Sequence, residues 1–287
     1  MSSVDGRLTI LAVVAHPHDI SHMCGTLAHH IADGDAVVAV AVTGGLTTHR
    51  ERLYDELRKP PAERDPRIIN QTDAAYGEQK AHEMAQACAL FGITDVRVLP
   101  FEDKPLEITP AVVDVLTEII YEVRPHLVLT HAPRGRQRHG MVDIAPEDHR
   151  DTGVAVTRAV RMANQPNAET GRTPHHVTSV YYTGVDLPLT EADLLVDITD
   201  QAANRMKAEI LFASQAQTPA FARKRTTIGA GTAGWHAQTG YAEPWIRAAA
   251  QVGRRLPVTR EELDNAEMSR QDCLARMSKL VSDEEAE

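Results

Sequence analysis

A short run of histidine and aspartate residues follows the first apolar segment of the chain. His16, His18, Asp19 and His22 lie within seven residues, directly after the apolar residues 8–15. Imidazole nitrogens and carboxylate oxygens are ligands that suit Zn²⁺. In open α/β sheets, ligands bind beyond the carboxyl ends of the strands, which is where this run lies if residues 8–15 form a strand. Taken alone, the run fits a metal site and a solvated histidine-rich turn about equally well.

A second cluster of the same kind follows a later apolar segment. His131, His139, Asp148 and His149 all come after the apolar residues 127–130. If both apolar segments belong to one sheet, the two clusters can converge at its carboxyl edge, and this convergence favours a metal site. A hydrolytic zinc ion has three protein ligands and keeps one position open for water. The Asp148 carboxylate is suited to orient an imidazole ligand by accepting its hydrogen bond.

The chain between and around these clusters alternates between strand-like and helix-like patterns. The strand-like segments are continuous apolar runs, which are typical of parallel strands covered on both faces. The segment at 109–123 begins with Thr-Pro, as helices often do, and carries apolar residues at helical spacing. We expect strands at 8–15, 36–43, 96–99, 127–130, 177–182 and 194–198, and helices at 26–32, 79–91, 110–123, 148–162 and 201–215. Residues 49–76 and 221–240 are predicted to be irregular surface segments.

This alternation predicts the fold class and the domain organisation. We expect one α/β domain at residues 1–256, Rossmann-like, with a mostly parallel sheet and helices on both faces. Residues 257–287 are expected to form a C-terminal helical extension, because Thr259 followed by Glu262 matches a capping box. The weak apolar stripe of this extension must bury against something, which is compatible with a homo-oligomer.

The composition argues against several classes of function. The net charge of -10 argues against a protein that coats nucleic acid or binds an anionic membrane surface. No apolar run approaches the roughly 18 residues of a membrane span, and residues 8–15 end in His-Pro-His-Asp rather than in an export cleavage site. The three cysteines are far apart, as expected in a reducing compartment. We therefore expect a cytoplasmic protein with neither a nucleic-acid nor a membrane partner.

These motifs resemble the LmbE/PIG-L family of zinc-dependent N-deacetylases. That family opens with a strand, then Ala-His-Pro-Asp-Asp, then a helix containing Gly-Thr-Leu. This chain has Ala-His-Pro-His-Asp at 15–19 and Gly-Thr-Leu at 25–27. The second block of the family is His-x-Asp-His, whose last two residues match Asp148 and His149. Weaker matches follow in the same order, and the resemblance covers about residues 7–250.

Carried over position by position, the resemblance implies that His16, Asp19 and His149 bind Zn²⁺ or another divalent metal. Two positions depart from the family pattern. His18 stands where the family has the aspartate that acts as general base, and Pro146 stands where it has the first histidine of the second block. Imidazole can accept a proton near neutral pH, so His18 is a substitute base, a fourth ligand that would close the site, or a bystander with no role in it.

The resemblance implies a metal-dependent hydrolase that cleaves an N-acyl bond, above all an N-acetyl bond, of an amino sugar or similar small molecule. In this hypothesis His18 and Asp148 are the catalytic residues. The alternative is a catalytically altered relative that binds a metal and a small ligand without hydrolysing it, because both departures fall at catalytic positions. The residues that bind the substrate, possibly a sugar, stay unassigned.

Other polar and aromatic residues allow two interpretations each. Arginines in the 131–146 loop either hold an anionic substrate or solvate the loop; they are Arg134, Arg136 and Arg138. Three late aromatic residues either form a wall for a sugar or pack in the core; they are Trp235, Tyr241 and Trp245. His22 is expected at the surface.

Overall fold

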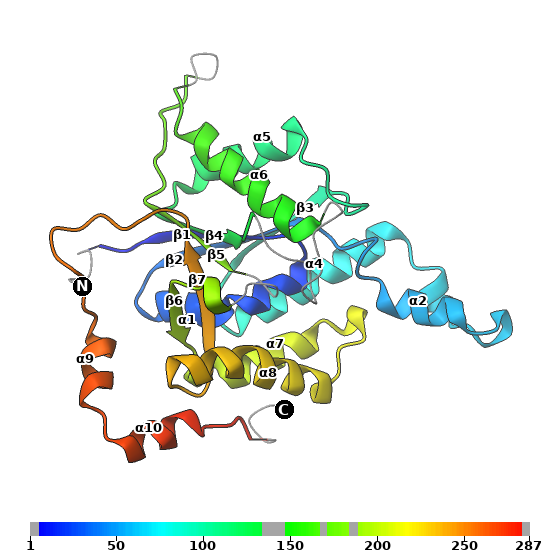
Figure 1. The fold of residues 1–287 in the computed structure, drawn as a ribbon. Helices are drawn as coiled ribbons and strands as arrows, with labels where there is room; N and C mark the ends of the chain where they lie inside the picture. Colours follow the sequence, from blue (N-terminus) through cyan, green and yellow to red (C-terminus); the bar gives the residue numbers. More distant parts are fainter. Residues whose placement is uncertain (1–5, 134–146, 167–170, 184–188, 283–287) are drawn as a thin grey trace.

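The computed structural model describes residues 6–133, 147–166, 171–183 and 189–282, and within them the chain forms one seven-stranded sheet (Figure 1). The strands are β1 (Thr9–Val14), β2 (Ala36–Thr43), β3 (Asp95–Phe101), β4 (Leu127–His131), β5 (Ser179–Thr183), β6 (Leu194–Asp197) and β7 (Ala242–Arg247). Their order across the sheet is β3-β2-β1-β4-β5-β7-β6. Paired neighbours are parallel, except that β7 runs antiparallel to β5 and β6.

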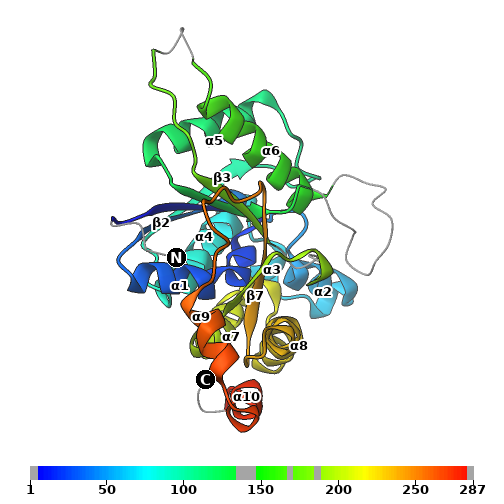
Figure 2. The ribbon, with the colours of Figure 1, turned by 60° about the vertical axis from the view of Figure 1, so that its left-hand side comes forward.

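Helices cover both faces of this sheet (Figures 1 and 2). One face carries α5 (Pro110–Val123) and α6 (Asp148–Ala163), and the other carries α1 (Cys24–Ala32), α4 (Asp73–Ala89), α7 (Ala202–Leu211) and α8 (Pro219–Ala237). Short 3₁₀ helices are η1 (Pro17–His22), η2 (Pro61–Glu63), η3 (Leu189–Glu191), η4 (Thr199–Gln201) and η5 (Ala213–Gln215). The mostly parallel, doubly covered sheet confirms the predicted Rossmann-like α/β class.

The central strand β1 is buried on both faces, which explains its unbroken apolar sequence. Ile10 and Val14 belong to the core under α1 and α4, whereas Leu11 and Val13 belong to the core under α5 and α6. Successive side chains of a strand point to opposite faces, so both faces of β1 must be apolar. This packing fixes the carboxyl end of β1, where the histidine-rich run begins.

The prediction that residues 49–76 are irregular was wrong in part, because they contain α2 (Glu51–Arg58) and α3 (Pro66–Ile69). In α2 the buried side chain is that of Glu56, which accepts hydrogen bonds from Lys59 Nζ (2.6 Å) and from the Asp65 amide (2.9 Å). The apolar residues of α2 are few and two of them, Tyr54 and Leu57, are exposed, so this short helix stands out little from the polar chain around it.

The prediction that residues 221–240 form a loop was also wrong, because most of them belong to α8. Thr218 caps this helix by accepting a hydrogen bond from the Phe221 amide, and proline follows at the first helical position. Glycine and threonine lower the intrinsic helix propensity of the segment. Packing explains Gly234, since a Cβ there would lie 2.5 Å from the Gly240 carbonyl oxygen.

The C-terminal part of the chain continues past β7 to α9 (Arg260–Glu267) and α10 (Arg270–Met277). The expected capping box forms at Thr259 and Glu262, each side chain accepting the other residue's amide hydrogen bond. Arg276 in α10 donates to the carbonyl of Gln238 at the end of α8 (2.7 Å). Within the described ranges, no helix has the length and apolar character that crossing a membrane requires.

Candidate metal centre

The two predicted clusters converge at the carboxyl edge of the sheet. β1 and β4 are parallel neighbours, with Val13 beside Thr130. His16 therefore follows β1 at the same edge at which His131 ends β4. His149 comes from the first turn of α6. This is the place that the topology of a parallel sheet assigns to a ligand site.

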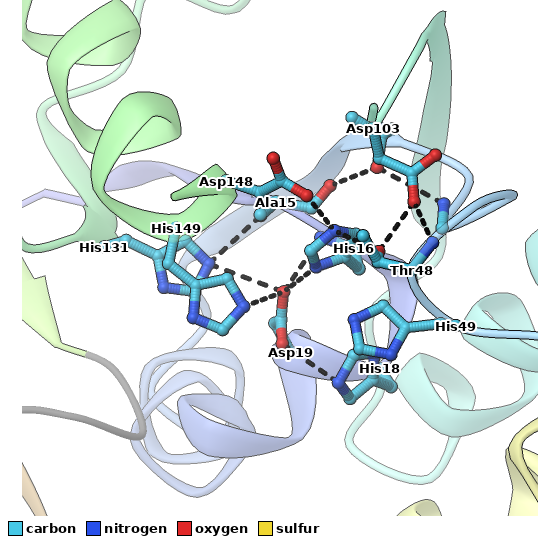
Figure 3. A network of polar contacts seen from close by, with 12 residues as sticks. Ala15, His16, His18, Asp19, Thr48, His49, Asp103, His131, Asp148 and His149 are labelled. Atoms are coloured by element: carbon cyan, nitrogen blue, oxygen red, sulfur yellow. Dashed lines mark hydrogen bonds and ion pairs between the residues drawn. The ribbon is translucent and has the colours of Figure 1, made fainter. Parts of the chain in front are cut away.

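Asp19 lies at the centre of the cluster (Figure 3). Its Oδ2 atom is 3.2 Å from His16 Nδ1 and 3.3 Å from His149 Nε2. One donor atom from each of these three residues lies within 4.8 Å of the others. The backbone amide of His16 also donates to Asp19 Oδ2 (2.8 Å), which fixes the carboxylate against the first turn of η1.

The charges of the cluster fit a bound cation. Burial alone would raise the pKa of Asp19, but the neighbouring His149, His18 and His131 hold it well below its usual range. Burial alone would lower the pKa of His16, but its hydrogen bonds to Asp148 and Asp19 raise it to about 9. His16 is thus favoured in its protonated, positively charged form beside the buried Asp19 carboxylate. Metal binding to such ligands releases protons, so a cation held by two imidazoles and one carboxylate fits this donor set.

Asp148 holds the far side of the His16 ring. Its Oδ2 is 3.1 Å from His16 Nε2, and its Oδ1 accepts a hydrogen bond from the Leu106 amide (2.7 Å). A carboxylate in this position selects the tautomer and the orientation of an imidazole ligand. The geometry agrees with the orienting role expected for Asp148.

His18 lies beside the other oxygen of the central carboxylate. Its Nε2 is 3.2 Å from Asp19 Oδ1, whereas His16 and His149 approach Oδ2. Its Nδ1 is buried and has no hydrogen-bond partner among the described residues. Burial and the neighbouring His49, Lys80 and His16 lower the pKa of His18 well below its usual value despite Asp19. The ring is therefore neutral, so that one of its two nitrogens carries a proton and the other is an acceptor.

Two residues of the site, Thr48 and His49, were missed; both follow β2, at the start of or just before the segment predicted to be irregular. The His49 ring lies 4.4 Å, centroid to centroid, from the rings of both His16 and His18. Thr48 Oγ1 is 3.3 Å from His16 Nε2. Thr48 also donates to Asp103, which follows β3 (Oγ1 to Oδ2, 2.6 Å). Their positions after neighbouring parallel strands were the signal that could have identified them.

The structure places the remaining candidate residues as follows. His131 belongs to the site: its ring stacks on His149 at 4.4 Å and its Nε2 accepts the Ala15 amide hydrogen bond (3.0 Å). The prediction that His22 lies at the surface was wrong, since it is 8% exposed. Tyr241 and Trp245 are buried in the core, whereas Trp235 is 67% exposed, so the three form no common wall. Arg134, Arg136, Arg138, His139 and Pro146 lie outside the described residues.

Comparison with known proteins identifies relatives that are named as deacetylases. A deacetylase of 1D-myo-inositol 2-acetamido-2-deoxy-alpha-D-glucopyranoside from Thermomonospora curvata is 32% identical over 185 residues, 58% of this chain and 56% of its own length. The match therefore spans little more than half of that relative. The enzyme of the same name from Thermobispora bispora is 28% identical over 283 residues, 86% of this chain and 84% of its own length.

Solved structures share the fold at lower identity. The N,N'-diacetylchitobiose deacetylase of Pyrococcus horikoshii superimposes with a TM-score of 0.64 and 20% identity, covering 83% of this chain and 82% of its own. The 4-carboxy-2-hydroxymuconate hydratase GalB of Pseudomonas putida superimposes with a TM-score of 0.68 and 19% identity, covering 87% and 100%. Since one neighbour is a deacetylase and the other a hydratase, this likeness establishes the fold and leaves the reaction open.

The family itself follows from the sequence. The profile of the PIG-L family, described as GlcNAc-PI de-N-acetylase, matches residues 11–160, which are 150 of the 287 residues. This range contains both clusters of the candidate metal centre, and the match confirms the resemblance drawn from the motifs. The chain therefore belongs to the PIG-L family.

Proposed function

We propose that this chain is a metal-dependent hydrolase that removes the acetyl group from an N-acetylated amino sugar or a similar small molecule. The observation that carries the proposal is the shared carboxylate of Asp19. One oxygen faces the donor atoms of His16 and His149, and the other faces the neutral ring of His18. The Asp19 carboxylate thereby places the metal-binding atoms of His16 and His149 next to the His18 ring, which can accept a proton. The names of the relatives support an amino-sugar amide as the bond that is cleaved.

In this proposal, His16, Asp19 and His149 hold Zn²⁺ or another divalent metal. Such an ion, when bound, polarises a water molecule and the amide carbonyl. Two imidazoles and a carboxylate form a three-ligand set typical of hydrolytic zinc sites, which keep one position free for water.

His18 is proposed as the general base in place of the usual aspartate of the family. In this proposal Nε2, which lies 3.2 Å from Asp19 Oδ1, carries the proton of the neutral ring, so that the lone pair of the buried Nδ1 is free to take a proton from water. His18 lies beside Asp19 Oδ1, whereas His16 and His149 lie beside Asp19 Oδ2. This separation argues against His18 as a fourth metal ligand. Asp148 would act as a positioning residue that holds the His16 ring through Nε2.

The test is deacetylation by purified protein whose metal content has been measured. A panel of N-acetylglucosamine glycosides would be offered, and the release of free amine would be followed. We expect about one divalent metal per chain and turnover with at least one glycoside. His18→Ala should lower turnover by about 10²- to 10⁴-fold while the metal stays bound. His82→Ala, which removes an exposed imidazole on α4, is the matched control and should change neither quantity.

Other outcomes separate the alternatives. Loss of metal in His18→Ala would assign His18 as a fourth ligand. Metal-loaded protein without turnover on any glycoside would favour the altered relative that binds without hydrolysis. In that case, a gain of activity in His18→Asp would show that only the base had changed. We also propose a cytoplasmic location, which the three free cysteines support.

A further inference from the structure

A cavity lies beside the metal centre, on the side of α7 and α8. It has a volume of about 520 Å³ and is bounded by η1, β5, β7 and the two helices. His22, at the end of η1, lines it three residues after Asp19. Thr183, which also lines it, pairs with His131 across β4 and β5. The cavity and the metal centre are therefore neighbours at the same edge of the sheet.

The walls of this cavity are cationic and apolar. Three positive side chains line it, from Arg205 on α7 and from Lys224 and Arg225 on α8. The described lining residues include no aspartate or glutamate. Apolar surface is added by side chains that include Phe221 and Ile228, which are 49% and 57% exposed. A cavity with these walls is suited to an anion that carries an apolar body.

His22 lies between two guanidinium groups. Its Nδ1 is 2.9 Å from an Nη2 atom of Arg205, and its Nε2 is 2.7 Å from Nη2 of Arg225. Burial and these two arginines lower the pKa of His22 well below its usual value, so the ring is neutral. A neutral imidazole offers one acceptor nitrogen, whereas a guanidinium can only donate. One of the two arginines therefore directs a donor at an N–H group.

The carboxylates behind the cavity do not remove this excess of donors. Glu243 accepts from Arg205 Nη1 at 3.3 Å, and Glu209 accepts from Arg225 Nη1 at 2.9 Å. The Nε–H of Arg205 is buried and has no hydrogen-bond partner among the described residues. The Arg205 side chain is only 7% exposed, so little water reaches it. The donors of the two guanidinium groups thus outnumber the acceptors around them, and an anion in the cavity would offset this imbalance.

We propose that this cavity binds an organic anion, with a carboxylate or phosphate group held by Arg205, Lys224 and Arg225 and an apolar body lying against Phe221 and Ile228. The oxyanion supplies the acceptors that the guanidinium groups lack, and a guanidinium matches two oxygens of either group. Because the cavity adjoins the metal centre, we infer that the anion is the distal part of the hydrolysed molecule. This last step rests on the proposed function, whereas the binding itself does not.

Binding would be measured by calorimetry on the full chain with four probes: acetate, hexanoate, inorganic phosphate and monohexyl phosphate. Each buried methylene should tighten binding by up to about fourfold. We therefore expect each hexyl probe to bind at least tenfold more tightly than its short counterpart. Hexanoate ahead of hexyl phosphate identifies a carboxylate as the natural group, and the reverse order identifies a phosphate.

Variants assign the binding to this cavity. Arg225→Gln should weaken hexyl-probe binding by about 10- to 100-fold, the usual loss for a charge-assisted hydrogen bond. Arg225→Lys should restore part of it, and Lys224→Gln, at an exposed position, should weaken binding without a risk to folding. Arg158→Gln, an exposed change of the same charge on α6, is the control. Absence of binding, or equal binding by Lys224→Gln and Arg158→Gln, overturns the proposal.

A kinetic comparison connects the cavity to the reaction. Two glycosides of N-acetylglucosamine would be compared, one with a hexyl and one with a 5-carboxypentyl aglycone. Arg225→Gln should lower kcat/KM at least tenfold more for the carboxylate than for the hexyl compound. If neither glycoside is hydrolysed while hexanoate still binds, the proposed function fails and the anion site stands. If both are hydrolysed and no anion binds, the anion site fails and the proposed function stands.

Discussion

Lys80 allows the packing behind the site to be tested by stability measurements. Its side chain is fully buried, its Nζ donates to Gln215 Oε1 (2.5 Å), and it lies 5.3 Å from the centre of the Phe212 ring. Burial outweighs the nearby carboxylates and lowers the pKa of Lys80 from the usual 10.5 to about 8. The variant Lys80→Met keeps the length of the side chain and removes the titrating group.

The sign of the effect follows from proton uptake on unfolding. Between pH 8 and pH 10.5 the unfolded chain binds a proton at Lys80 that the folded chain has released. The free energy of unfolding therefore rises with pH across this window. The burial penalty is fully present below pH 8, and its relief amounts to about 3 kcal/mol over the whole window, at 1.36 kcal/mol per pKa unit. Over the practical range of pH 7.5–10, the gain is about 2 kcal/mol.

The measurement is urea unfolding of wild type and Lys80→Met at several pH values, with chelator present so that bound metal contributes nothing. All other groups titrate alike in both proteins, so the difference between the two free energies isolates Lys80. It should change by about 2 kcal/mol in favour of wild type between pH 7.5 and pH 10. Lys279→Met, at an exposed position, should track wild type. Parallel curves for wild type and Lys80→Met would refute the argument, because they would mean that Lys80 titrates alike in the folded and unfolded chains.

Four further changes test the site and its surroundings. His149→Ala removes one donor of the three-residue cluster, so metal analysis of the folded variant should find little bound metal. Asp148→Asn should weaken metal affinity or turnover by about 10- to 100-fold in titrations, because the carboxylate that orients His16 is lost. Glu243→Ala leaves the Arg205 guanidinium buried without its carboxylate, which should lower the free energy of urea unfolding by about 3–5 kcal/mol. Deletion of residues 260–287, most of the proposed extension at 257–287, should leave metal content unchanged. Loss of bound metal from a folded truncation would show that the functional domain extends further toward the C-terminus.

The fold class could be read from the sequence because its central strands β1, β2 and β4 are buried on both faces. An apolar run such as residues 36–43 has few other places in a folded chain, and β2 occupies Ala36–Thr43. Besides α2 and α3, α8 and β7 escaped prediction for local reasons. α8 contains glycines whose packing partners are distant in sequence, and β7 contains Pro244, which argues against a strand when context is absent. Tertiary contacts outweighed local propensity in both.

The sequence alone determined which side chains could hold a cation and that two groups of them follow apolar segments, because ligand chemistry is a property of residue types. Only the tertiary structure decided which of their atoms meet. The pairing of β1 with β4 sets His16 beside His131, and the first turn of α6 brings His149 to them. The turn of η1 directs one oxygen of Asp19 to His16 and His149 and the other to His18. The tertiary structure also brought His49 to the metal centre and set His22 between two arginines. Such contacts join residues up to about two hundred positions apart, and no local pattern encodes them.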